Sequence, residues 1–425
     1  MKLHYCIFFM LISAVSFAQD AVQKPIISEL KIVGLKKTKE SLIRKIARVE
    51  AGETLDSLRL SEDIERLKRL SSTAFAEYKV AKKADGTYVV TYRMEENFTI
   101  IPGLNIFTSN NDEVAFRVAL FEFNLFGQNI TTGGFFLRDV FNSYGGYWEA
   151  PYLFSDKLGL SFNYKNNDTF EPVFFGDTEV DYRNRNITTE AKILYNFDFH
   201  HRAELGVRYF SNDFQFLEES VEGGIAVPIR EEANDLAYRG LYEYANVDIV
   251  YQYITGIRFK NTIEFIANPD DNINSTFTGI SELQYFAKIG EKGNLATRTQ
   301  FSFSSNNDTP FAPFVVDNNL NIRGSGNIQD RGTSAIIINT EYRHTFHEKG
   351  WFVVQGNAFV DASSWRNTNR DFSELFDGST FKVNPGLGIR FIHKRIFNAV
   401  IRIDYGFDVT GDGDSGLVFG IGQFF

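Results

Sequence analysis

The chain has 425 residues, a formal net charge of −10 and a single cysteine, Cys6. The acidic balance argues against nucleic acid as a partner, and one cysteine excludes a disulfide framework and a thiolate zinc site. Phe (43) and Tyr (19) are abundant although the mean hydropathy is only −0.21, which is typical of strands whose two faces differ.

The first 18 residues have the pattern of a secretory signal peptide. Lys2 supplies the positive charge, residues 6–15 are apolar, and small residues stand at positions 16 and 18. A transmembrane anchor is the alternative, but about ten apolar residues cannot span a hydrocarbon core that needs about 20. We therefore expect cleavage after Ala18 and export of the mature chain.

Residues 19–97 mix helical and strand periodicity and predict one small α+β domain. Leu60, Ile64 and Leu67 are spaced i, i+4, i+7, which places them on one face of a helix. Asp85 and Gly86 between two apolar runs indicate a hairpin turn. The expected order is β-α-α-β-β, with a strand at 26–33, helices at 40–48 and 58–70, and strands at 77–81 and 88–94.

From residue 98 to residue 425 the pattern has a period of two residues. Near the end, for example, Ile401 and Ile403 alternate with Arg402 and Asp404. In a soluble sandwich the apolar face would be the core, whereas in an outer-membrane barrel it faces lipid and the charged face lines the lumen. The export signal, the repeated inward charges and the aromatic residue at the end, Phe425, favour the barrel.

The sequence accordingly predicts a mostly β fold, a sixteen-stranded antiparallel transmembrane β-barrel preceded by the small α+β domain. An even number of strands is typical of single-chain bacterial barrels. The expected strands are 100–107, 112–123, 129–139, 142–150, 157–167, 181–197, 201–214, 236–248, 250–266, 276–288, 293–305, 333–346, 351–363, 380–393, 397–408 and 415–425.

Two interruptions stand apart from this pattern. Residues 306–332 are not strand-like, and a loop of that length usually carries function or is disordered. Residues 408–414 hold three aspartates with glycine, which resembles part of a calcium loop. The twelfth position of such a loop, where Glu binds calcium, falls on Phe419, so we interpret this segment as a solvated acidic turn.

Two sets of short motifs stand in a fixed order along the chain. The first set is Ile32-Val33-Gly34, Gly52, Asp63-Ile64-Glu65-Arg66-Leu67, Phe75 to Val80 and Tyr88-Val89-Val90. The second set is Asn124-Leu125-Phe126-Gly127, Glu149-Ala150-Pro151-Tyr152-Leu153, Asn321-Ile322-Arg323-Gly324, Gly356 to Asp361, Gly386 to Arg390 and Ile401 to Gly406. The first set resembles a POTRA domain. The second resembles the barrel of the superfamily that includes BamA, TamA and two-partner-secretion transporters.

The resemblance implies a location and a class of partner. It implies an outer-membrane protein of a Gram-negative bacterium whose N-terminal domain lies in the periplasm. The implied partners are the lipid bilayer and unfolded outer-membrane or secreted polypeptides, together with accessory periplasmic proteins or lipoproteins. This chain departs from the family in having one POTRA-like domain, Ser325 where an aromatic residue follows the Arg-Gly pair, and Ser363 where the family has glycine.

Arg323 and Gly324 lie within the long interruption, at the loop-tip motif of the family. A partly desolvated guanidinium needs an anionic partner, and its planar fork suits a carboxylate. By strand parity Glu341 and Asp361 point into the lumen, so we expect Arg323 to pair with Asp361, or with Glu341 as the second candidate. The alternative is a solvated arginine in a glycine-rich surface turn.

The last expected strand holds Gly416, Gly420 and Gly422 and runs to Phe425. Glycine weakens a strand interior and permits bends, which would lower the cost of parting the first and last strands of a barrel. Ordinary packing against bulky neighbours is the alternative. The resemblance implies that this seam opens laterally and that the aromatic end is a recognition signal for assembly.

We therefore expect an outer-membrane insertase or polypeptide translocase that works without nucleotide, cofactor or metal. The sequence contains no G-x-S-x-G motif, P-loop or Cys/His nucleophile pair, so an enzymatic function is not expected. Three alternatives remain, namely a dedicated two-partner secretion pore, a passive substrate channel or porin, and a structural anchor for a partner complex.

Overall fold

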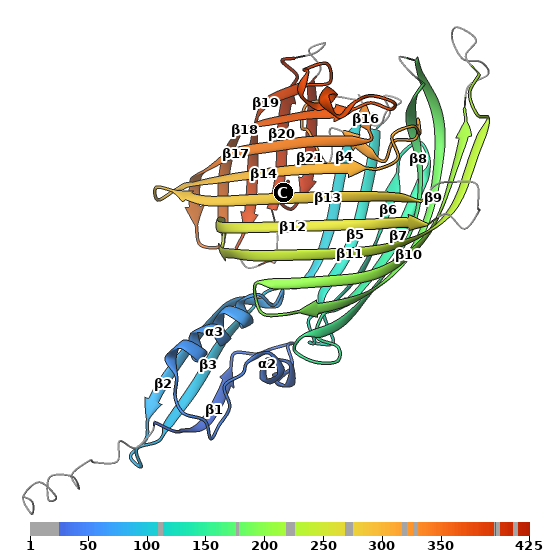
Figure 1. The fold of residues 1–425 in the computed structure, drawn as a ribbon. Coiled ribbons are helices and arrows are strands. Elements are labelled where there is room, and N and C mark those ends of the chain that lie inside the picture. The colour runs from blue at the N-terminus through green and yellow to red at the C-terminus, as the bar shows by residue number, and fades with distance from the viewer. Residues whose placement is uncertain are drawn as a thin grey trace, which may run out of the picture.

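The computed structural model describes residues 25–108, 114–175, 178–217, 226–267, 275–316, 321–325, 330–394, 396, 400–410 and 415–425. It consists of a small N-terminal domain and a barrel attached to it (Figure 1). The expected signal peptide and residues 411–414 of the acidic turn lie outside the described residues. No helix in the described part of the chain is long and apolar enough to cross a membrane.

The N-terminal domain has the predicted β-α-α-β-β order. Strand β1 (Ile27–Val33) is followed by helices α2 (Glu40–Ile46) and α3 (Ser57–Lys68) and by strands β2 (Thr73–Lys82) and β3 (Tyr88–Glu96). The sheet order is β1-β3-β2, with β1 parallel and β2 antiparallel to the central strand β3. Within the described residues, β2 therefore has one edge without a partner strand, whereas the outer side of β1 is hydrogen-bonded at its start to residues 52–55.

Helix α3 packs its apolar face onto this sheet. Leu60, Ile64 and Leu67 are buried in the core of the domain. Among them Asp63 is fully buried, and its carboxylate accepts hydrogen bonds from the Tyr92 hydroxyl (2.8 Å) and from two backbone N–H groups that follow α2. Because a buried carboxylate is tolerated only where donors surround it, this network fixes the α2–α3 connection against the sheet.

Sixteen strands close into one barrel, which confirms the predicted strand number and fold class. All neighbouring strands in the barrel wall are antiparallel, including the pair that closes it, β21 and β4. The strands are β4 (Ile100–Thr108), β5 (Val114–Leu125), β6 (Ile130–Arg138), β7 (Asn142–Ala150), β8 (Leu158–Phe175), β9 (Thr178–Asn196), β10 (His201–Phe216), β11 (Arg230–Val250), β12 (Tyr253–Ala267), β13 (Thr276–Ile289), β14 (Gly293–Ser304), β17 (Ser334–Lys349), β18 (Phe352–Arg366), β19 (Lys382–His393), β20 (Val400–Phe407) and β21 (Ser415–Ile421).

The structure corrects the predicted boundaries at several places. Strand β11, expected at 236–248, begins at Arg230, and β2, expected at 77–81, begins at Thr73. Strand β8 continues past residue 167 to Phe175, because the ladder with β9 accommodates Pro172 and the mixed faces that break the alternation there. The last strand, expected at 415–425, ends at Ile421. The interruption at 306–332 contains a short hairpin, β15 (Phe314–Val316) and β16 (Asp330–Gly332), which was not predicted. A short 3-10 helix, η2 (Phe372–Phe376), follows β18.

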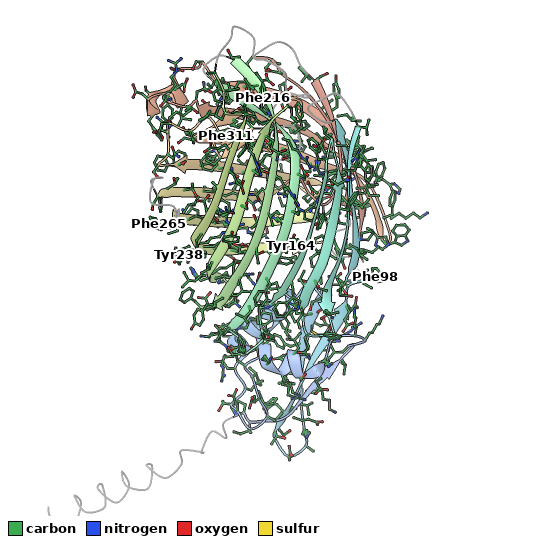
Figure 2. All side chains as sticks on the ribbon, turned by 90° about the vertical axis from the view of Figure 1, so that its right-hand side faces the viewer. Phe98, Tyr164, Phe216, Tyr238, Phe265 and Phe311 are labelled. Atoms are coloured by element: carbon green, nitrogen blue, oxygen red, sulfur yellow. The ribbon has the colours of Figure 1, made fainter. Side chains whose placement is uncertain are left out.

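Apolar side chains face outward along the wall, and polar side chains face the lumen. On β17, Ile338 is exposed on the outside, whereas Asn339 and Glu341 are buried inside. Tyr238 and Phe265, two of the aromatic residues on the outer surface, are labelled in Figure 2. This alternation is the pattern of a barrel whose outer face meets lipid.

The N-terminal domain docks on the turn between β5 and β6. The Lys39 N–H donates a hydrogen bond to the Gly127 carbonyl (3.0 Å), and the Asn124 side-chain amide donates to the Thr38 hydroxyl (3.0 Å). Gly127 has a φ of +71°, and a Cβ added there would collide with the backbone of the domain. A glycine is therefore required at this contact.

Further contacts place the domain beneath the strands β5 to β11 (Figure 1). Tyr152, in the turn between β7 and β8, packs against the core of the domain. Arg69, which follows α3, lies over the Phe199 ring (5.4 Å to the centroid) and donates to the Ala245 carbonyl (3.1 Å) near the end of β11. The domain is thus held at several points around one side of the barrel.

Candidate functional site at the latch and the seam

We call residues 305–333 the strap. Its described parts, 305–316, 321–325 and 330–333, lie between β14 and β17, and its tip enters the lumen. The β15–β16 hairpin forms the base of the strap. Next to it, Val316 and Ile322 of the strap pack with Ala335 and Trp365 of the wall in a small apolar cluster. The strap tip is therefore packed inside the barrel and is not a solvated surface turn.

Arg323 is fully buried at the tip of the strap. Its Nε and Nη2 atoms donate to the two carboxylate oxygens of Asp361 (2.8 and 3.0 Å), and its Nη1 donates to Glu341 (2.8 Å). The backbone N–H of Arg323 also donates to Asp361 (3.0 Å). A bidentate pair of this kind adds geometric specificity to the charge attraction. One side chain thus holds the strap tip to both β17 and β18, and we call Arg323 with Asp361 and Glu341 the latch.

Two phenylalanine rings cover the guanidinium of Arg323. Its Cζ atom lies 3.7 Å from the centroid of the Phe359 ring and 4.3 Å from that of the Phe424 ring. Gly324, the next residue, has a φ of +93°, and a Cβ added to it would collide with the backbone of Gly406 in β20. The Arg-Gly pair therefore combines a buried charge with a backbone contact that only glycine allows.

The carboxylates of the site belong to a larger buried charge cluster that the sequence analysis did not identify. Glu341 also accepts hydrogen bonds from Arg343 and Arg390, and Asp404 accepts one from Arg402 (3.3 Å). These residues occupy inward positions of β17, β19 and β20. Their charge alternates with apolar residues in the sequence, and that alternation was the signal that could have identified them.

The barrel closes weakly between its last and first strands. Within the described residues, β21 and β4 share a single residue pair, Phe419 with Ile106, whereas β20 and β21 share seven. Continuing the register from that pair toward the N-terminal domain would place residue 424 beside Ile101. The chain instead leaves the wall after Ile421, so the start of β4 has no partner strand there among the described residues. Pro102 lies in this part of β4, which fits a strand edge.

Residues 422–425, which we call the hook, turn from the wall into the lumen. Gly422 has a φ of +100°, and its N–H donates to a carbonyl at the start of β20 (2.7 Å). Beyond it, the Gln423 side chain accepts a hydrogen bond from Arg390 (2.9 Å), and Phe424 covers Arg323. The hook therefore connects β21, a strand of the seam, to the tip of the strap.

The structure brings most of the predicted site residues together. Arg323, Glu341 and Asp361 are in direct contact, and Gly422 begins the hook that reaches them. Phe425, expected at the end of the last strand, lies instead in the lumen, with its ring centroid 5.9 Å from the Arg343 guanidinium. Two residues lie apart from the latch, within the β20–β21 ladder: Gly416 and Gly420.

Comparison with known proteins gives the same two parts. The POTRA family model, described as "Surface antigen variable number repeat", matches residues 25–97. CdiB from Escherichia coli has a similar structure, with a TM-score of 0.63 and 10% identity over 94% of this chain and 77% of that chain. CdiB from Acinetobacter baumannii has a TM-score of 0.60 and 11% identity, over 94% of this chain and 74% of that chain. BamA from Haemophilus ducreyi lacking POTRA domains 1–3 has a TM-score of 0.57 and 14% identity, over 95% of this chain and 85% of that chain.

No curated protein sequence matches this chain. Sequence identities of 10–14% show a common fold and nothing finer. The predicted resemblance to proteins that combine a POTRA domain with a sixteen-stranded barrel is confirmed at that level, with one POTRA-like domain among the described residues.

Proposed function

We propose that this protein resides in an outer membrane, with its POTRA domain in the periplasm, and that it inserts or translocates other polypeptides without nucleotide. Three features support the proposal together. They are the POTRA domain, the outward apolar faces of the wall, and a seam that leaves part of one strand edge free.

The free edge of β4 is the observation that carries the proposal. Backbone N–H and C=O groups that face lipid must be paired, because lipid offers no hydrogen bonds. A strand edge satisfies an incoming strand through main-chain hydrogen bonds, which tolerate many sequences. The free part of β4 follows directly after the POTRA domain, so a polypeptide arriving from the periplasm would meet it first.

The POTRA domain supplies a second strand edge on the same route. Strand β2 lies at the border of the domain's sheet, and its residues 79–82 are exposed. An unfolded chain can add a strand to such an edge with little dependence on its sequence. In the proposed mechanism, β2 captures the client, β4 templates its first strand, and the bound strap keeps the barrel wall braced while the seam opens.

A disulfide across the seam tests this mechanism. Ile106 and Phe419 are direct ladder partners, so the double variant Ile106→Cys/Phe419→Cys can be oxidised to join β4 to β21. The only native cysteine lies in the expected signal peptide and does not interfere. In proteoliposomes supplied with an unfolded outer-membrane barrel protein, oxidation should abolish client insertion, and reduction should restore it.

A second disulfide provides the matched control. Phe116 is the partner of Ile106 on its other side, in β5, where the two strands share nine residue pairs. The Ile106→Cys/Phe116→Cys bond joins strands that are already fully paired, so oxidation should leave insertion unchanged. If the oxidised and the reduced forms of the Ile106→Cys/Phe419→Cys protein insert client equally well, insertion does not use the seam.

Passage of a polypeptide through the lumen is the second candidate function. A cavity of about 850 Å³ lies inside the barrel, and amide, hydroxyl and charged side chains line most of it. The disulfide between positions 106 and 419 would not block this route. Export that continues after oxidation would therefore favour a secretion pore. A passive porin would instead show a large, steady single-channel conductance in the unmodified protein.

A further inference from the structure

The inward faces of β8, β9 and β10 change from polar to apolar toward the end of the barrel that lies away from the POTRA domain. On β9, for example, Asn186 and Asn184 line the lumen cavity, whereas Tyr182 belongs to an apolar cluster. An apolar patch that faces a polar lumen is unfavourable unless another group covers it. The apolar inward residues are Val173, Phe175, Val180, Tyr182, Phe214 and Phe216.

Phe311, at the start of the strap, covers this patch. The centroid of its ring lies 4.3 Å from that of Phe214, 5.5 Å from that of Tyr182 and 6.4 Å from that of Phe175. The contacts with Tyr182 and Phe175 are edge-to-face, at 88° and 89°, which is a favoured geometry for aromatic pairs. We call Phe175, Tyr182, Phe214 and Phe216 the cage. Phe311 and Phe216 lie near the same end of the barrel in Figure 2, opposite the POTRA domain.

The strap is anchored to two different sides of the lumen. Its tip is bound to β17 and β18 through Arg323. On the facing side, the ring contacts of Phe311 with the cage and an ion pair between Arg331 and Glu171 join the strap to β8, β9 and β10. The strap therefore bridges the lumen. Its cage side is held by ring contacts and one ion pair, whereas its latch side is held by a buried charge cluster.

The contact between Phe311 and the cage borders the lumen cavity. Phe311, Ala312 and Pro313 line this cavity together with Phe214 of the cage. The rest of the lining comes mainly from inward residues of β8 to β14. Several of these strands also carry the turns on which the POTRA domain docks, at the opposite end of the barrel. The cavity thus lies between the POTRA domain and the cage.

We propose that the cage is a binding site for an aromatic side chain, that Phe311 is its resident occupant, and that the filled cage closes the lumen at the end away from the POTRA domain. Release of Phe311 opens the cavity to that side, while the Arg323 latch keeps the rest of the strap in place. The inference rests on the cavity and the strap, and it does not depend on insertion at the seam.

Single-channel recording of the full-length protein in planar lipid bilayers tests this closure. The Phe311→Ala variant should raise the open probability about tenfold or more, which corresponds to about 1.4 kcal/mol in the opening equilibrium, because a methyl group cannot fill the cage. Phe376→Ala is the matched control, since it removes an exposed ring from η2, outside the cage. Its conductance should equal that of the unmodified protein.

A reversible cross-link covers the case in which Phe311→Ala disturbs folding. In the variant Phe311→Cys/Phe214→Cys, a short thiol cross-linker that reduction cleaves should keep the channel closed, and cleavage should open it in the same molecules. The proposed closure is wrong if the unmodified protein has the same open probability as Phe311→Ala, or if cleaving the cross-link does not change the open probability. Client insertion through the oxidised Ile106→Cys/Phe419→Cys seam is measured in parallel, because insertion that continues there would refute the proposed function and leave the channel result intact.

Discussion

At the scale of single residues, the distribution of buried charge sets Arg323 apart from the neighbouring arginines. Glu341 and Asp404 each lie between several arginines, so each keeps a partner if one arginine is lost. Among the described residues, Asp361 forms its ion pair with Arg323 alone. Losing Arg323 therefore leaves one specific carboxylate buried without a counter-charge, a situation that proteins strongly disfavour.

The first prediction concerns this stranded carboxylate. Breaking a buried ion pair costs about 3–5 kcal/mol, so Arg323→Ala should release the strap tip and expose the strap to protease. The barrel should still form, because its ladders do not involve the strap, but client insertion should fall. Arg323→Lys should rescue little, since an ammonium group cannot make the bidentate contact with Asp361. Limited proteolysis beside the insertion assay measures both effects.

Two double variants separate charge from geometry at the same site. Arg323→Ala/Asp361→Asn removes the stranded charge and should recover stability but not insertion. The exchange Arg323→Asp/Asp361→Arg should fail, because the new aspartate would face Glu341 and Asp404. If Arg323→Ala leaves proteolysis and insertion unchanged, the latch has no role.

The second prediction concerns pH and the docking loop of the POTRA domain. Partial burial acts to raise the pKa of Glu96, but the backbone N–H groups of Lys37, Lys36 and Thr38, which donate to its carboxylate, hold that pKa below the usual value. The folded pKa thus lies below the unfolded value of about 4.3, so the stabilisation is full above that pH and is lost as the pH falls through the folded pKa.

Hydrogen exchange at the amides of residues 36–38 provides the measurement. Their protection should fall at a pH below about 4.3 and should already be low at neutral pH in Glu96→Gln, which lacks the charge. Glu95→Gln is the control, because the Glu95 side chain is more than half exposed. Protection of these amides in Glu96→Gln that equals that of the unmodified protein at neutral pH would show that the carboxylate does not hold this loop.

At the scale of elements, the strands could be predicted because apolar and polar residues alternate within each strand. Alternation gives the inward faces of β17 and β18, which carry Glu341 and Asp361. The pairing with Arg323 could be predicted only because the resemblance also places the Arg-Gly pair at a loop tip in the lumen. The hook and the cage could not be predicted in this way. Gly422 permits a turn but does not specify its direction, and Phe311 contacts strands that are more than 90 residues earlier in the chain. Both depend on where the barrel places distant segments across its lumen.

The third prediction tests the hook as a link between seam and strap. Removing a cation–π contact costs about 0.5–2 kcal/mol, so Phe424→Ala should increase proteolysis of the strap, but less than Arg323→Ala does. The same change should slow disulfide formation in Ile106→Cys/Phe419→Cys, because β21 loses an anchor. Phe425→Ala should have a smaller effect, since its ring is farther from the nearest guanidinium. An effect of Phe425→Ala that equals or exceeds that of Phe424→Ala would contradict this assignment.

At the scale of the whole molecule, the POTRA domain and the seam are neighbours because they are adjacent along the chain. The domain docks on β5 to β11, and its last strand leads directly into β4, whose first residues have no partner strand on the seam side in the described part of the chain. A client bound at β2 would therefore need only a short path to the seam. For the proposed function, this arrangement favours a POTRA domain that stays fixed on the barrel while a client is inserted.

The fourth prediction follows from this fixed arrangement. Thr38 and Asn124 are in hydrogen-bond contact across the docking surface, so a disulfide in Thr38→Cys/Asn124→Cys would hold the domain in the observed position. Client insertion should be the same in the oxidised and the reduced protein. Gly127→Val is the opposite test, because its side chain would collide with the backbone at residues 37–39, undock the domain and reduce insertion. If oxidation abolishes insertion and reduction restores it, the domain has to move during insertion, and the fixed arrangement is contradicted.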